Sequence, residues 1–217
     1  MLKAIKYLIK ASQKNKISII KILILHLYYQ YFRNKNIFSH PNVQIKGLKN
    51  ISTKGPLRIG LNYVGFVHKK DYVLLNIRGQ LNINGDFSIG QGCRLDLSKG
   101  SIVNFGNNSC ITAFTKLIIV HGLTIGDNCS ISWDCLIIDD DFHQINYNGK
   151  NLNPIDNQIV IGNHVWIGSN VSIYKGVNIP NGSVIASNSV LKSSFNEENS
   201  LIAGNPAKVI KSGVKWN

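Results

Sequence analysis

Aliphatic residues recur at every sixth position over much of this chain. The most regular series lies in the C-terminal half and comprises Ile161, Ile167, Ile173, Ile179, Ile185 and Leu191. A period of six fits neither the 3.6-residue turn of an α-helix nor the two-residue alternation of one long strand. It predicts a solenoid in which each hexad supplies one short strand and one turn, with the aliphatic side chain inward. Stacked coils would then pair their backbones about 4.8 Å apart around a continuous aliphatic column.

The same pattern extends toward the N-terminus with less regularity. Its earlier members are Ile77, Ile83, Ile89 and Leu95, then Phe105, Ile111 and Leu117 after a register slip, then Ile125, Ile131 and Ile137. A small or β-branched residue often stands four positions later, as Cys129 follows Ile125. Gly and Asn, which tolerate the backbone conformations of tight turns, are frequent between the predicted strands. The predicted fold class is all-β, with a solenoid over residues 37–200 and a closing segment over residues 201–217.

The first 36 residues carry a different pattern. Apolar residues between Leu2 and Ile9 recur at helical spacing with lysines on the other side, which predicts a basic amphipathic helix. The run from Ile17 to Phe32 is almost continuously apolar, but Lys21 interrupts it and it is shorter than the ~20 residues that span a bilayer. We expect residues 1–36 to form a helical segment that either lies on an anionic membrane surface or packs on the domain or a neighbouring subunit.

Charge is concentrated in the same part of the chain. The formal net charge is +13, and 14 Lys and Arg but no Asp or Glu precede Asp71, whereas the remainder has 10 basic and 11 acidic residues. Positive charge is thus a local property, which disfavours a nucleic-acid partner. The four cysteines lack C-x-x-C spacing and stand among apolar or small residues, which favours a reducing compartment. We expect a cytoplasmic protein, peripheral at the inner face of the membrane if residues 1–36 bind lipid.

The hexads stop after Ile138 and resume about 20 residues later. An insertion of this length has to leave a tight solenoid, so residues 139–158 are expected to form a protruding loop. The loop begins with three aspartates, which we expect to form a solvated turn, and His143 follows them. A histidine in such a loop is either an ordinary surface residue or a general base. Cys135 is an alternative nucleophile, but its register directs the thiol inward, where thiols are usually inert.

Three segments carry a resemblance to a known family. They are the Asp-x-Asp-x-His pattern of Asp139, Asp141 and His143, the restart Ile161-Gly162-Asn163-His164-Val165-Trp166-Ile167-Gly168-Ser169, and Ala203-Gly204-Asn205-Pro206-Ala207-Lys208. From about Leu57 to Val209, and most clearly from Leu123 onward, the chain resembles the hexapeptide-repeat acyltransferases, among them maltose, galactoside and capsular-sugar O-acetyltransferases. The resemblance implies a left-handed parallel β-helix, a homotrimer with active sites between subunits, and acetyl-CoA as co-substrate.

The resemblance also implies roles for individual residues. His143 matches the family's catalytic base, which takes the proton of an acceptor hydroxyl as that hydroxyl attacks the thioester. The residues implied to bind the coenzyme are Trp166 against the pantetheine arm, Gly168, Ser169 and Ser187 through close backbone approach, and Lys192 and Lys208 near the nucleotide phosphates. A tryptophan packed at a subunit interface and lysines that are merely solvated are the alternatives at these positions.

No metal site is expected. The zinc-binding branch of this fold, the γ-class carbonic anhydrases, has two histidines five apart, whereas His121, His143 and His164 are 22 and 21 residues apart here. His121 and Trp133 are candidates for the border of the acceptor pocket. The acceptor-side Asn of galactoside and maltose acetyltransferases has no counterpart, because Thr112 falls near its place.

The function expected from these residues is transfer of an acetyl group from acetyl-CoA to a sugar hydroxyl, in the synthesis of a surface polysaccharide. The alternative is a non-catalytic β-helix that serves as a scaffold or a membrane-docking module.

Overall fold

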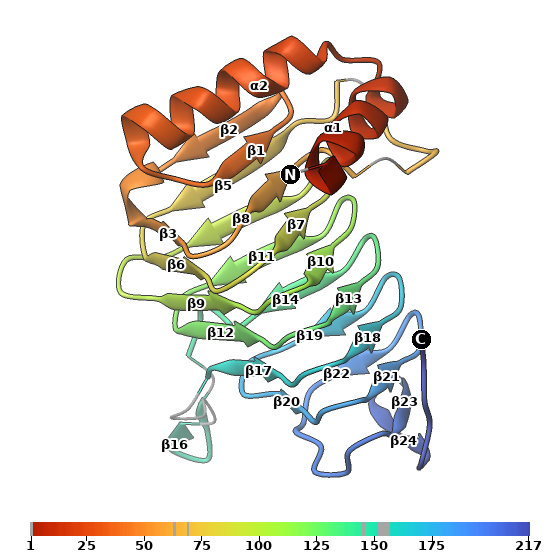
Figure 1. Cartoon of the computed structure of the whole chain (residues 1–217). Helices are drawn as coiled ribbons and strands as arrows, with labels where there is room; N and C mark the ends of the chain where they lie inside the picture. The colour runs from red at the N-terminus through yellow and green to blue at the C-terminus, as the bar shows by residue number, and fades with distance from the viewer. Residues whose placement is uncertain (1, 63, 69, 145, 152–156) are drawn as a thin grey trace.

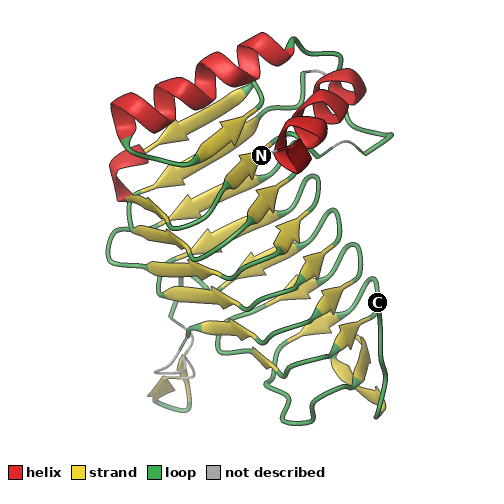
Figure 2. Cartoon of the chain, in the orientation of Figure 1, coloured by secondary structure: helices red, strands yellow, loops and turns green. Residues whose placement is uncertain are grey.

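The computed structural model describes residues 2–62, 64–68, 70–144, 146–151 and 157–217. From Ile37 onward the chain winds through three sheets of parallel strands that form the sides of a triangular prism, a left-handed parallel β-helix (Figure 1). The predicted fold class is therefore confirmed. Helices lie across the N-terminal end of the prism, and the connecting loops run along its edges (Figure 2).

The helical elements are α1 (Leu2–Asn15), α2 (Ile19–Leu27), the π-helix η1 (Tyr28–Phe32) and the 3-10 helix η2 (Leu48–Asn50). Tyr29 of η1 joins the main hydrophobic core, whereas Ile22 of α2 packs with Leu8 of α1 and with Leu61. Ile9, which the helical spacing assigned to the apolar side, is instead 41% exposed. None of the helices in the described ranges is both long and apolar enough to cross a membrane. α2 and η1 cover the end of the aliphatic column, and α1 packs beside it in a separate cluster (Figure 1).

Three sheets make up the prism. Sheet A contains, in spatial order, β1 (Ile37–Ser39), β4 (Leu57–Ile59), β7 (Phe87–Ile89), β10 (Ser109–Ile111), β13 (Ser130–Ile131), β18 (Trp166–Ile167), β21 (Val184–Ile185), β23 (Leu201–Gly204) and β24 (Ala207–Lys211). Sheet B contains β2 (Val43–Lys46), β5 (Val73–Ile77), β8 (Arg94–Leu97), β11 (Lys116–Ile119), β14 (Leu136–Ile138), β19 (Ser172–Ile173) and β22 (Val190–Leu191). Sheet C contains β3 (Ile51–Thr53), β6 (Gln80–Ile83), β9 (Ile102–Phe105), β12 (Gly122–Ile125), β17 (Ile159–Ile161) and β20 (Asn178–Ile179). Pairing is parallel within the prism except that β24 returns antiparallel along β23 and ends sheet A.

The inward positions of the hexads form the core. Every member of the series from Ile161 to Leu191 is at most 1% exposed, and the small residues four positions later, from Cys129 to Ser189, are at most 2% exposed. Each inward Ile or Leu contributes roughly 1.5–3 kcal/mol of transfer free energy. The sixfold pattern of the sequence therefore marks the inside of the prism, as predicted.

Strand pairing gives the length of each coil. Ile167 pairs with Ile185, so a coil takes 18 residues there, which is three hexads. Ile89 pairs with Ile111 at a separation of 22, because extra residues are accommodated at the corners, and this explains the register slip between Leu95 and Phe105. Ile131 pairs directly with Ile167, 36 residues later, so the insertion at residues 139–158 leaves the ladder of sheet A unbroken.

Asparagine residues occupy many of the corners. Asn108, Asn128, Asn170 and Asn188 have φ angles of 54°, 57°, 57° and 62°, the left-handed conformation that Asn tolerates better than most residues. The Asn108 amide donates to Asn128 at 2.8 Å, and the Asn170 amide donates to Asn188 at 2.6 Å. His164 takes the same conformation with φ 54°, for which histidine is also enriched. The corner geometry therefore accounts for the Asn residues at these four positions.

Candidate active site

The loop that interrupts the hexads leaves the prism between β14 and β17, at the corner where sheet B meets sheet C. It includes a short antiparallel hairpin of β15 (Asn146–Tyr147) and β16 (Lys150–Asn151), which stands away from the prism in Figure 1. Residues 145 and 152–156 of the predicted loop lie outside the described residues. The stem of the loop, residues 139–143, is described in full.

Asp139 holds the beginning of this stem. Its side chain is fully buried, and its carboxylate accepts hydrogen bonds from the backbone N–H groups of Val120, His121 and Gly122 at 2.7, 2.8 and 2.8 Å. These donors form the same corner of the preceding coil. A buried carboxylate requires such donors because burying an unpaired charge is costly. The expectation of a solvated turn of three aspartates is therefore wrong for Asp139.

Asp140 ties the two ends of the loop together through a histidine. Its Oδ2 atom lies 2.7 Å from His121 Nε2, and the Asn157 amide lies 3.0 Å from the same nitrogen. Its Oδ1 atom accepts a hydrogen bond from the backbone N–H of Phe142 at 2.5 Å. Desolvation acts to raise the pKa of Asp140, but the hydrogen bonds from His121 and Phe142, together with a nearby lysine, hold it below its usual value. Asp140 is therefore ionised at neutral pH.

Asp141 connects the stem to the following coil and to His143. Its carboxylate lies 2.5 Å from Lys175 Nζ, and its backbone carbonyl oxygen lies 3.2 Å from His143 Nδ1. When Nδ1 carries the proton and donates it to this carbonyl, the imidazole lone pair is on Nε2. His143 is an exposed residue. The stem thus presents at the surface an imidazole whose Nε2 is suited to accept a proton.

Trp166 lies on a different side of the prism, at the start of β18. Its side chain points outward and is 42% exposed, and its indole nitrogen lies 3.4 Å from Ser132 Oγ. The ring of Trp216 is 6.2 Å away between centroids and stacks on His164 at 4.3 Å, with its indole N–H donating to the His164 carbonyl at 2.9 Å. The result is an exposed aromatic cluster beside sheet A, in which the rings of Trp166 and Trp216 are tilted by 44°.

Gly168, Ser169 and Ser187 stack at the corner between sheets A and B. The backbone N–H of Ser169 donates to Ser187 Oγ at 3.1 Å, and the two hydroxyl oxygens are 3.2 Å apart. Ser169 also lines an open groove of about 630 Å³ together with Trp133 and Asn170. This corner therefore offers polar backbone and hydroxyl groups beside an aromatic side chain.

Gly168 is expected to be required for stacking of the coils. A Cβ atom at this position would lie 2.7 Å from the backbone nitrogen of Ser187, a distance that forces the backbone to shift. We expect Gly168→Ala to lower the free energy of unfolding by about 1–3 kcal/mol in chemical denaturation. Gly65→Ala is the matched control, because a Cβ atom at Gly65 would meet nothing within 4 Å. A Gly168→Ala protein as stable as the control would contradict this structural role.

The residues expected to form the site do not converge within one chain. Trp166 lies on sheet A and Ser169 at the A–B corner, whereas His143 lies at the B–C corner. Lys192 directly follows β22 and so shares the corner of His143, while Lys208 lies on β24, three strands beyond β18 in sheet A. Both lysines are exposed. One chain therefore offers an imidazole on one side of the prism and most of the expected coenzyme-binding residues on another.

The cysteines are not suited to nucleophilic chemistry. Cys135 is 2% exposed, and its thiol donates a hydrogen bond to the Gly168 carbonyl at 3.2 Å. Burial raises the pKa of Cys135, and it raises the pKa of Cys93 to about 12, so the reactive thiolate is disfavoured. Among the described residues there is no group of three or more His, Cys, Asp and Glu side chains that could hold a metal ion.

Sequence reasoning missed the contacts that hold the stem. The spacing of 17–19 residues between Asp139 and its three donors shows no recognisable motif, and Lys175 is 34 residues from Asp141. Trp216 is separated by 52 residues from the histidine on which it stacks. The coil length is the signal that could have found them. A residue at one corner of the prism contacts the residue at the same corner of the next coil, which lies one coil length away in sequence.

Comparison with solved structures defines the class of protein. NeuO, a polySia specific acetyltransferase, is 26% identical with a TM-score of 0.56, over 84% of this chain and 89% of NeuO. The hexapeptide-repeat containing acetyltransferase VCA0836 from Vibrio cholerae is 27% identical with a TM-score of 0.50, over 58% of this chain and 70% of VCA0836. AntD, an N-acyltransferase from Bacillus cereus, shares the fold at 21% identity and a TM-score of 0.54, over 82% and 80% of the two chains. The chain has the fold of acyltransferases.

Sequence comparison then gives the family. The family model described as bacterial transferase hexapeptide (six repeats) matches residues 158–193. A Klebsiella pneumoniae protein described as an uncharacterized 24.8 kDa protein in the cps region is 40% identical over 206 residues, which are 94% of this chain and 91% of that protein. The chain belongs to the hexapeptide-repeat acyltransferase family.

Proposed function

We propose that this protein transfers an acetyl group from acetyl-CoA to a hydroxyl of a sugar in a surface polysaccharide, with His143 as the general base. The observation that carries the proposal is the stem of residues 139–143, in which three aspartates are each bound to a different partner and His143 Nδ1 faces a backbone carbonyl. These contacts fix the place at which His143 leaves the prism, which supports a catalytic role for it. The polysaccharide acceptor is supported by the relative in a cps region and by NeuO, whose acceptor is polysialic acid.

The reaction needs a base because a sugar hydroxyl is a weak nucleophile until its proton is removed. In the proposed mechanism His143 Nε2 accepts this proton as the hydroxyl oxygen attacks the carbonyl carbon of the thioester. The tetrahedral intermediate then expels the thiolate, which receives the proton from His143. The bond formed is an ester to the sugar, and the bond broken is the thioester.

Acetyl-CoA is proposed to bind along sheet A and the A–B corner. Trp166 supplies an exposed flat face for the pantetheine arm, and the stacked turns of Gly168, Ser169 and Ser187 allow close backbone approach. The strand of Lys208, β24, is three strands from the strand of Trp166, β18, which is a distance of about 14 Å along the prism. This distance suits a contact of Lys208 with the nucleotide phosphates. Lys192, at the corner of His143, is proposed to meet the phosphates only from a neighbouring chain.

We propose that the protein is a homotrimer, and the geometry of one chain supports a site shared between two chains. Because His143 and the residues proposed to bind coenzyme lie on different sides of one prism, a complete site requires the B–C corner of one chain beside sheet A or the A–B corner of another. A closed ring of three chains provides three such sites. The four free cysteines support a cytoplasmic protein, where acetyl-CoA is available.

The proposal is tested by incubating the purified protein with acetyl-CoA and a panel of oligosaccharides, including amino sugars, and following thiol release. We expect acceptor-dependent turnover and a product whose acetyl group is removed by mild alkali, as an ester is and an amide is not. Trp166→Ala is expected to raise the KM for acetyl-CoA by about tenfold, a loss of about 1.4 kcal/mol. An alkali-stable product would contradict O-acetylation, and absence of turnover with every acceptor would favour a scaffold.

A further inference from the structure

The N-terminal cap exposes an apolar stripe that the prism does not cover. Ile20, Ile24, Leu27 and Tyr31 stand at positions i, i+4, i+7 and i+11 of the continuous helix formed by α2 and η1, and they are 63%, 60%, 49% and 78% exposed. This spacing puts them on one face. We call these four residues the cap stripe.

Other large side chains widen the cap stripe. Leu23, Tyr28 and Phe32 are 40%, 39% and 79% exposed. The opposite face of the same helix, with Ile22 and Tyr29, is buried against the protein. Single exposed apolar residues are ordinary, but seven large ones on one short helical segment form a contiguous patch of the kind that marks an interaction surface.

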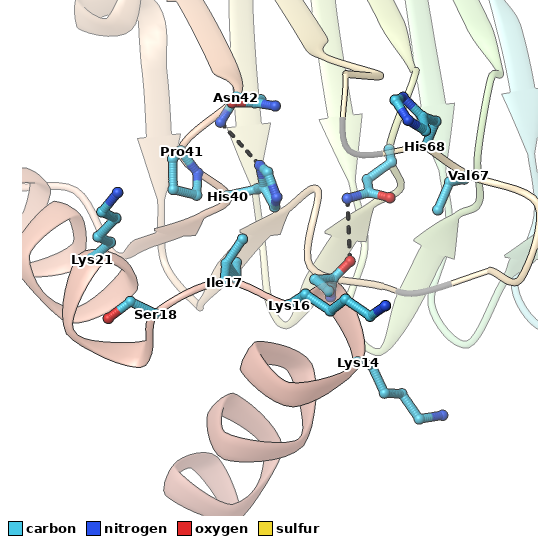
Figure 3. A pocket seen from close by; sticks show the side chains of 12 residues that line it. Lys14, Lys16, Ile17, Ser18, Lys21, His40, Pro41, Asn42, Val67 and His68 are labelled. Carbon is cyan, nitrogen blue, oxygen red and sulfur yellow. Dashed lines mark hydrogen bonds between the residues drawn. The ribbon is translucent and has the colours of Figure 1, made fainter.

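Cationic residues flank both ends of the cap stripe. At its N-terminal end, Lys14, Lys16 and Lys21 surround a cavity of about 510 Å³ at the connection between α1 and α2, as Figure 3 shows. At the other end, Lys35 and Lys49 line a second cavity of about 780 Å³, together with Arg33, Tyr28 and Phe32.

No acidic residue occurs anywhere in the sequence before Asp71, so nothing in this segment neutralises these cations.

The charge decides between two kinds of occupant. A second copy of this chain, docked face to face through the cap stripe, would bring two cationic surfaces together, which disfavours it. An anionic bilayer offers apolar chains to the cap stripe and phosphate groups to the lysines. Tyrosine and phenylalanine side chains such as Tyr31 and Phe32 are also suited to the boundary between headgroups and acyl chains.

We propose that the cap stripe docks this protein on an anionic phospholipid membrane, with α2 and η1 parallel to the membrane plane. Because α2 lies across the N-terminal end of the prism (Figure 1), docking in this way directs the prism away from the bilayer. The site of acyl transfer then faces the aqueous phase beside the membrane. This proposal is independent of the acceptor and of the role of His143.

The test is sedimentation of the full chain with vesicles of phosphatidylcholine alone and of phosphatidylcholine with 30% phosphatidylglycerol, a ratio of roughly one anionic lipid in three. We expect binding to the anionic vesicles that weakens as salt is raised. Lys14→Gln, Lys16→Gln and Lys21→Gln together are expected to lower the partition coefficient about 100-fold, at roughly fivefold per lysine. Ile20→Gln, Ile24→Gln and Leu27→Gln together are expected to lower it by a similar factor.

Matched controls use exposed residues of the prism. Ile102 and Ile210 are 53% and 56% exposed, and Lys99 and Lys211 are exposed lysines far along the chain from the cap. Their replacement by Gln is expected to leave vesicle binding unchanged. Equal binding to neutral and anionic vesicles, or full binding by the cap-stripe variant, would overturn the proposal. A third outcome is that the wild-type protein does not bind vesicles but forms larger assemblies in light scattering, and that the cap-stripe variant forms fewer of them. This outcome would show that a second copy of the chain covers the cap stripe.

Discussion

Replacement of His143 by alanine is expected to lower kcat for acetyl transfer by about 100-fold to 10,000-fold, the range for removing a general base. The physical reason is that the acceptor hydroxyl then has to attack the thioester without a group to take its proton. The KM for acetyl-CoA is expected to change little, because His143 is proposed to contact the acceptor hydroxyl and is not among the residues proposed to bind the coenzyme. The measurement is steady-state kinetics of thiol release with the acceptor identified in the panel.

The control for this variant is His68→Ala, which removes another exposed imidazole from a different loop. It is expected to retain full activity. Since His143 is exposed, its replacement is also expected to leave the free energy of unfolding within about 0.5 kcal/mol of the wild-type value. An His143→Ala enzyme with kcat within a few-fold of wild type, and equal stability, would show that another group removes the proton.

Replacement of Asp139 by alanine is expected to lower the free energy of unfolding by about 3 kcal/mol or more, because three backbone N–H groups, one buried and two partly buried, lose their acceptor at a cost of roughly 1–3 kcal/mol each. The three bonds, from Val120, His121 and Gly122, all end on this one carboxylate. Activity is expected to fall as well, since the stem that orients His143 begins at Asp139. Chemical denaturation measures the first effect, and kinetics below the unfolding transition measure the second.

Two companion variants separate structure from charge. Asp139→Asn keeps one oxygen acceptor and is expected to be less destabilised than Asp139→Ala. Asp141→Asn removes the charge of the partly exposed ion pair with Lys175 and is expected to cost about 1 kcal/mol, less than the loss of the buried Asp139 carboxylate. If Asp139→Ala were as stable as Asp141→Asn, the buried carboxylate would not be holding the corner of the preceding coil.

Much of the fold could be predicted because each coil repeats one local rule. An inward Ile or Leu every six residues, with Asn or Gly where the backbone turns, is visible in the sequence and corresponds to the buried column from Ile161 to Leu191. The coil lengths were less predictable. Coils of 20 residues, such as that from Ile111 to Ile131, place their extra residues at the corners. Extra residues there extend into solvent and do not disturb the packing of the core.

The candidate site was predictable in part. The break in the hexads and the resemblance to a family pointed to His143, but neither indicated how it is held. The partners of the stem lie on the coils above and below, at His121 and Lys175, and Asp139 is buried although two further aspartates follow it in sequence. A pattern along the chain cannot indicate contacts between coils unless the length of each coil is known.

The amino-acid sequence was sufficient for the solenoid, the cationic N-terminal segment and the position of the loop, because each depends on the order of residues within one or two hexads. The burial of Asp139, the orientation of His143 through its Nδ1 atom, and the outward face of α2 and η1 emerge only when coils are stacked. Stacking sets residues about one coil apart in sequence some 4.8 Å apart in space, and hydrogen bonds and burial depend on that short distance.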